Sequence, residues 1–142
     1  MTSLNHAREQ LETAVDLSAI LDAAYACFMA MLPVIEHQQD PGNPLFVPFV
    51  LAGTSAANGR FALAAAPSLS SSTRALELAP CTGAAVLAGD AMLALGHLAE
   101  VLDRRLREAA LTAADAADRQ ACAIAARHAA NISARCGRTP PS

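Results

Sequence analysis

The sequence predicts an all-α protein, on the evidence of apolar periodicity, helix-ending signals and composition. Apolar residues recur at helical spacing over residues 17–35 and again over residues 87–106. Prolines and capping residues divide the chain into stretches of helix length. Hydrophobic residues make up 54% of the chain and charged residues only 16%, which supplies ample material for a core. We therefore expect a single-domain bundle of four main helices over residues 1–137, with a frayed tail at 138–142.

The first predicted helix follows Ser3, a residue type that favours helix N-caps, and extends to about Gln39. A break is expected near residues 16–18, where an aspartate and a serine interrupt the apolar pattern. The segment "DPGNP" at residues 40–44 then ends this helix and starts the next.

The second predicted helix has Asn43 as its N-cap and runs from Pro44 to about residue 66. A β-hairpin is the alternative, because Asn58 and Gly59 form a common turn pair. The alanine-rich flanks and the lack of strict alternation favour the helix. Its large apolar residues spread around most of the circumference, which predicts a central and mostly buried position.

The remaining chain predicts a short helix or loop near residues 68–80, followed by two long helices. The third main helix is expected over residues 82–110, with one apolar and one charged face. Thr112 and Asp115 approximate a capping box, and they would start a fourth helix that ends near residue 135.

Charge and cysteine usage narrow the class of protein. The net charge is −3 and all ten basic residues are arginine. The basic cluster at residues 103–107 has an acid on each side of its arginines, so no nucleic-acid surface is indicated. The polar N-terminus has no secretory signal, and the uncharged stretch at residues 41–59 is too polar to cross a membrane. We therefore expect a cytoplasmic protein with neither nucleic acid nor membrane as partner.

The four cysteines indicate neither a disulfide framework nor a metal site. They lie far apart in sequence, without the pairs that zinc sites use: Cys27, Cys81, Cys122 and Cys136. We expect reduced thiols that pack as small hydrophobic residues, no resident metal and no cofactor.

A polar cluster within the second predicted helix is the most informative feature for function. Thr54, Ser55, Asn58 and Arg60 interrupt a helix that is expected to be buried, and buried polar groups need partners. Two interpretations remain open. The cluster could satisfy itself and fix the helix register, or it could line a pocket for a small molecule.

Three side chains outside this helix are candidate catalytic residues. Tyr25 and Glu36 lie along one edge of the first helix, where Glu36 could pair with Arg60. His128 shares a helical sector with apolar residues, which predicts an interior position and makes it the best general-base candidate. A packed core histidine and solvated carboxylates are the structural alternatives.

The leading functional hypothesis is a small, largely apolar ligand held between helices by the polar cluster. The protein would then be a binding protein or a cofactor-independent enzyme, for which a role in specialised metabolism is compatible with the composition. The alternative is a structural or interaction protein, a homodimer or larger homo-oligomer whose surplus apolar surface forms the interface. A metal-binding bundle around His97 and Glu100 is the third hypothesis.

Overall fold

The computed structural model describes residues 2–76 and 87–136 of the chain. Within those residues the protein is all-helical, with six helices and no strand. The helices are α1 (Thr2–Thr13), α2 (Leu17–His37), α3 (Phe46–Ala64), α4 (Ser71–Arg74), α5 (Ala88–Thr112) and α6 (Ala116–Cys136). The predicted all-α class is confirmed for this part of the chain.

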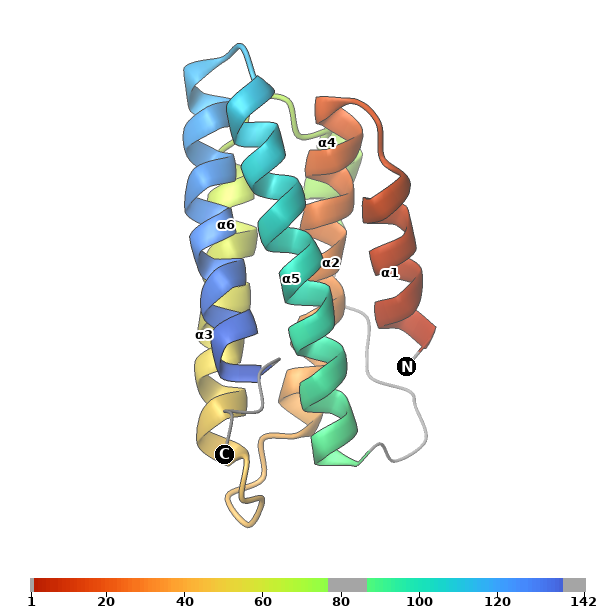
Figure 1. Cartoon of the computed structure of the whole chain (residues 1–142), viewed down its shortest axis with the longest axis vertical. Coiled ribbons are helices and arrows are strands. Elements are labelled where there is room, and N and C mark those ends of the chain that lie inside the picture. Colours follow the sequence, from red (N-terminus) through yellow and green to blue (C-terminus); the bar gives the residue numbers. More distant parts are fainter. Residues whose placement is uncertain (1, 77–86, 137–142) are drawn as a thin grey trace.

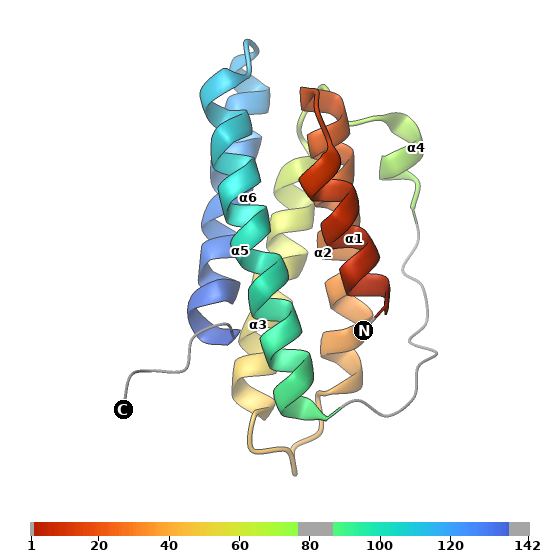
Figure 2. The same cartoon turned by 45° about the vertical axis from the view of Figure 1, so that its right-hand side comes forward.

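Four long helices contact one another in the circular order α2, α3, α6 and α5 (Figure 1). Helix α1 packs against α2 and α5, and the single turn of α4 lies beside α2 (Figure 2). The largest fully buried side chains come from α1, α2, α3 and α5: Leu4, Leu11, Leu21, Phe28, Met31, Ile35, Phe49, Leu63, Leu95, Leu98, Leu102 and Leu106. Helix α6 contributes mainly alanine to this core.

The first predicted helix is divided into α1 and α2 by residues 14–16. Asp16 causes the restart, because its carboxylate accepts a hydrogen bond from the backbone N–H of Ala19 at 2.8 Å. An aspartate at an N-cap satisfies a donor that the first helical turn cannot. The expected break near residues 16–18 therefore falls slightly earlier in the chain.

Helix α2 is long and apolar enough, by length and composition, to cross a membrane. The core helix of a globular protein passes the same test, and ten residues of α2 are buried against the rest of the chain. The expectation that the chain does not contact a membrane was based on residues 41–59 and did not include α2.

Helix α3 is continuous through Asn58 and Gly59, so the helix rather than the hairpin is correct. It begins at Phe46, two residues later than predicted. The side chain of Asn43 accepts a hydrogen bond from the N–H of Leu45 at 2.9 Å, which holds residues 43–45 in a turn before the helix.

The predicted central and mostly buried position of α3 is wrong. Six residues of α3 are buried, compared with ten of α2, and the side chains of Val47 and Phe61 are 60% and 80% exposed. Helix α3 packs mainly against α2 and α6, so part of its circumference has no neighbouring helix among residues 2–76 and 87–136. An apolar residue on every side of a helix therefore does not require burial within one chain.

Helix α4 is a single turn that begins at its N-cap Ser70, whose hydroxyl accepts a hydrogen bond from the N–H of Thr73 at 3.2 Å. The predicted short helix extended further, over residues that lie partly outside the described ranges. The predicted start of the third main helix at residues 82–83 also lies outside them.

Helix α5 continues to Thr112, and Asp115 rather than Thr112 caps α6. The carboxylate of Asp115 accepts hydrogen bonds from the N–H groups of Ala117 at 2.8 Å and Asp118 at 3.2 Å. Thr112 instead donates its hydroxyl proton to the carbonyl of Glu108 within α5, so the predicted capping box does not form. The tail predicted at 138–142 lies outside the described residues.

Candidate functional site

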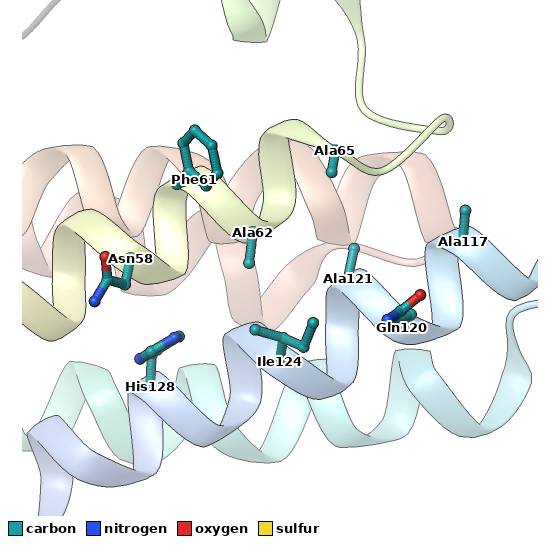
Figure 3. Close-up of a pocket in the computed structure, with 9 residues that line it drawn as sticks. All are labelled: Asn58, Phe61, Ala62, Ala65, Ala117, Gln120, Ala121, Ile124 and His128. Atoms are coloured by element: carbon teal, nitrogen blue, oxygen red, sulfur yellow. The ribbon is translucent and has the colours of Figure 1, made fainter.

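A groove with a volume of about 450 Å³ lies between the antiparallel helices α3 and α6. Figure 3 shows its lining, which comes from these two helices and the residue after α3: Asn58, Phe61, Ala62, Ala65, Ala117, Gln120, Ala121, Ile124 and His128. Sites for small molecules have volumes of about 300–1,000 Å³. The groove therefore has the size of a ligand site.

Alanine is the reason that the groove exists. Ala62 and Ala65 on one wall face Ala117 and Ala121 on the other, and methyl side chains leave the space between two helices unfilled. Only Phe61 and Ile124 contribute large apolar side chains to the lining. The walls are consequently apolar, and the opening faces solvent.

The polar side chains of the groove lie at its two ends (Figure 3). Asn58 from α3 and His128 from α6 occupy one end, and Gln120 lies toward the other. Asn58 is exposed, and His128 is half-buried. An amide can both donate and accept hydrogen bonds, so this end can bind a polar atom of a ligand.

The environment of His128 favours its neutral form. Burial is the largest cause of a pKa below the ordinary value of 6.5, and the charge of neighbouring Arg127 lowers the pKa further. A neutral imidazole has one nitrogen that donates and one that accepts a hydrogen bond. The predicted interior position needs correction, because His128 lies at the groove and not in the core.

The predicted polar cluster of α3 is divided, because Thr54 and Asn58 share an exposed side of the helix whereas Ser55 and Arg60 do not lie there. Thr54 is exposed and donates a hydrogen bond to the carbonyl of Val50 in its own helix. Ser55 is buried, and Arg60 donates from Nη1 to the sulfur of Met29 on α2 at 3.1 Å. Two residues along an α-helix differ by about 200° in direction, so Asn58 and Arg60 point to different sides of α3.

The predicted partnership of Glu36 with Arg60 is wrong. Glu36 is exposed on α2, and the ion pairs of the described residues join Arg8 to Glu12, Arg105 to Glu108 and Arg107 to Asp103. Tyr25 is buried in α2 and is not part of the groove lining. Of the three candidate catalytic residues, only His128 lies at the groove.

The glycines of α3 serve packing against α2. A Cβ atom added at Gly59 would lie 2.5 Å from the ring of Phe28, and one added at Gly53 would lie 3.1 Å from a methyl group of Ile35. Both distances are shorter than ordinary van der Waals contact. The side chains of α2 therefore fill the space that the small residues of α3 leave.

A buried acid that the sequence analysis missed fastens the connection after α3. Asp118 is 2% exposed, and its two carboxylate oxygens accept hydrogen bonds from the N–H (3.0 Å) and hydroxyl (2.6 Å) of Ser68. Asp22 accepts from the N–H of Ser70 at 3.0 Å. The helical sector that Asp118 shares with buried Ala121 and Ala125 was the available signal for its burial.

Three arginines bind carbonyl groups at or just beyond the C-terminal ends of α1, α3 and α5. The ribbons show that these three helix ends point toward the same end of the molecule (Figures 1 and 2). Arg74 donates to carbonyls at the end of α3 and beyond, Arg105 to those at the end of α1, and Arg119 to those after α5. The carbonyl acceptors are those of Leu11, Ala14, Ala64, Ala66, Leu69, Ala113 and Ala114. A guanidinium has several donors, so one arginine can bind more than one carbonyl at the end of a helix.

The described cysteines are free and buried, as predicted: Cys27, Cys122 and Cys136. Burial raises the pKa of the Cys122 and Cys136 thiols to about 11, and it raises that of Cys27 as well. These thiols are therefore protonated near neutral pH, which disfavours nucleophilic chemistry. Cys81 lies outside the described residues.

His97 and Glu100 are exposed on α5. Across residues 2–76 and 87–136, no group of three or more histidine, cysteine, aspartate or glutamate side chains is arranged to hold a metal ion. The candidate site in the described residues is therefore the groove with Asn58 and His128, and not a metal site at His97 and Glu100.

The chain was also compared with known proteins. No protein-family model, no curated protein and no solved structure matches it.

Proposed function

We propose that the chain is a single-domain four-helix bundle that binds a small, largely apolar molecule in the groove between α3 and α6. The circular contact order of α2, α3, α6 and α5 supports the bundle, with α1 as an additional helix on one side. The groove's apolar walls and its polar end at Asn58 and His128 support the binding function.

The single observation that carries this proposal is the pairing of an apolar groove with convergent polar groups at one end. A ligand site is mostly apolar, with few polar groups that fix orientation. Asn58 and neutral His128 offer donors and acceptors without a net charge. The matching ligand is neutral, with an apolar body and one carbonyl or hydroxyl group.

The proposal includes a binding protein and a cofactor-independent enzyme. An enzyme would use His128 as general base, because a neutral imidazole can accept a proton from a bound hydroxyl or C–H group. Tyr25 and Glu36 lie away from the groove, so this version depends on His128. A cytoplasmic location and a role in specialised metabolism remain part of the proposal on composition alone.

Calorimetric titration with 2-naphthol tests the groove, because this probe is mostly apolar and carries one hydroxyl group. We expect saturable binding by the natural chain and loss of binding in the Ile124→Trp variant, whose side chain fills the groove. Leu111→Trp is the matched control, since Leu111 is 86% exposed and lies outside the lining. Equal affinities in all three proteins would contradict the proposal.

The polar end is tested separately with His128→Phe and Asn58→Ala. Each removes a hydrogen-bonding group, which contributes about 1 kcal/mol, so the affinity for 2-naphthol should fall roughly 5- to 10-fold. Asn131→Ala is the control, because Asn131 is exposed on α6 outside the groove lining. Unchanged affinity in both variants would leave the orientation role without support.

A further inference from the structure

One side of α3 carries a row of exposed side chains, which we name the outer seam. Its members are Val47, Leu51, Thr54, Asn58, Phe61 and Ala65. All six are exposed in the single chain, including three large apolar residues with exposed fractions of 60% (Val47), 37% (Leu51) and 80% (Phe61). Exposed large apolar side chains that gather on one side of a helix mark interaction sites.

The spacing of the outer seam is that of a coiled-coil contact. Its members are separated alternately by four and three residues, the a and d pattern that keeps one stripe of a helix facing a partner helix. From Val47 to Ala65 the seam is about 27 Å long, at the usual rise of an α-helix. The seam is therefore shaped for contact with a second helix along its whole length.

The outer seam carries no charge. The chain has ten basic and thirteen acidic residues, and none of them is in the seam. A two-fold interface places the same surface on both partners, so a charged residue near the axis would meet its own kind. An uncharged seam fits contact with another copy of the same chain.

The order of residues in the outer seam identifies the orientation of that copy. When two seams pack antiparallel, Leu51 faces Phe61 of the second copy, Thr54 faces Asn58, and Val47 faces Ala65. Apolar residues then meet apolar residues, and the Thr54 hydroxyl can hydrogen-bond the amide of Asn58. The seam is self-complementary in this one register.

We propose that the protein forms a homodimer in which the outer seams of α3 pack antiparallel about a two-fold axis. Asn58, Phe61 and Ala65 belong to both the seam and the groove. The second copy's α3 would therefore lie over the groove and provide a further wall for the ligand. This last consequence rests on the proposed function, whereas the dimer rests on the seam alone.

Sedimentation equilibrium of the whole chain tests the dimer. We expect a dimer for the natural chain and at least a roughly tenfold weaker association for Leu51→Glu, because a carboxylate would be buried against Phe61 of the second copy. Leu111→Glu is the control at an exposed leucine outside the seam and should leave association unchanged. A monomer at every concentration, or a dimer that Leu51→Glu does not weaken, would overturn the proposal.

A charge pair tests the antiparallel register. Leu51→Lys and Phe61→Glu should each weaken association, whereas the double variant should recover part of it, since each lysine then faces a glutamate of the second copy. In a parallel dimer like charges would meet, and the double variant would be no better than the single ones. Absence of recovery would overturn the register.

The two proposals can fail independently. A dimer that binds no 2-naphthol would remove the ligand function and leave the seam standing. A monomer that binds 2-naphthol would remove the seam dimer and leave the groove. If both hold, the monomeric Leu51→Glu variant should bind 2-naphthol more weakly than the dimer does, because it lacks the second wall.

Discussion

The two sides of α3 differ in how their space is filled. Toward α2, the ring of Phe28 occupies the position that a side chain at Gly59 would need, and Ile35 approaches Gly53 in the same way. On the outer side, Phe61 is 80% exposed beside a groove that alanine leaves open. One helix therefore joins the core on one side and presents exposed side chains, three of them large and apolar, on the other.

This difference shows that an apolar residue type in the sequence does not identify what the side chain packs against, or whether it is buried within its own chain. Phe28 and Phe61 are equally apolar, yet only Phe28 is buried within the chain. The side toward α2 is part of the hydrophobic core. The outer side is available for a ligand or a second copy.

The largest expected effect is the difference in the free energy of unfolding between alanine variants of Phe28 and Phe61. Phe28→Ala should lower the free energy of unfolding by about 3–5 kcal/mol, because it leaves a cavity in the core. Phe61→Ala should change the free energy of unfolding of the monomer by less than about 0.5 kcal/mol, because most of the Phe61 side chain is exposed to solvent. Urea unfolding at the lowest workable protein concentration measures both. Similar losses in the two variants would contradict the comparison.

The next effect concerns glycine on the α2 side. Gly59→Ala should lower the free energy of unfolding by about 1–2 kcal/mol, because the clash with Phe28 outweighs the better helix propensity of alanine. Gly89→Ala on α5 is the control, since nothing lies within 4 Å of an added Cβ there. It should be neutral or stabilising by up to about 1 kcal/mol. A stabilising Gly59→Ala would show that Phe28 can move aside.

The smallest effect belongs to the groove side and depends on pH. The pKa of His128 is lowered in the folded protein, so the unfolded chain takes up a proton first as the pH falls below about 6.5. The unfolded state then binds more protons, and stability is lost as the pH falls through the folded pKa. His128→Gln should reduce this loss relative to the natural chain. Urea titrations at several pH values measure the difference.

Much of the helical structure could be predicted from local patterns. The apolar spacing of α2, α5 and α6 reflects the core that each helix faces, and proline and asparagine signals limited α3 to within a few residues. The caps were harder to predict, because Asp115 and Thr112 are both suitable residue types and their competition is settled by backbone geometry.

The site was only partly predictable. Asn58 and His128 were singled out from the sequence, and both line the groove, but Arg60 was grouped with Asn58 despite pointing to another side of α3. The partnership of Asp118 with Ser68 joins residues fifty positions apart, which no local pattern encodes. The groove itself results from missing side-chain volume, and its position depends on how α3 and α6 pair.

The arginines that cap α1, α3 and α5 imply that the two ends of the helical bundle unfold locally in a definite order. They bind backbone carbonyls at one end of the bundle, and each joins segments that are separated in sequence. At the opposite end, the turn between α2 and α3 is held by Asp40 and Asn43 through short-range bonds within residues 38–45. Backbone amides near that turn should therefore exchange with deuterium first, and the bundle should fray from there toward the end that the arginines hold.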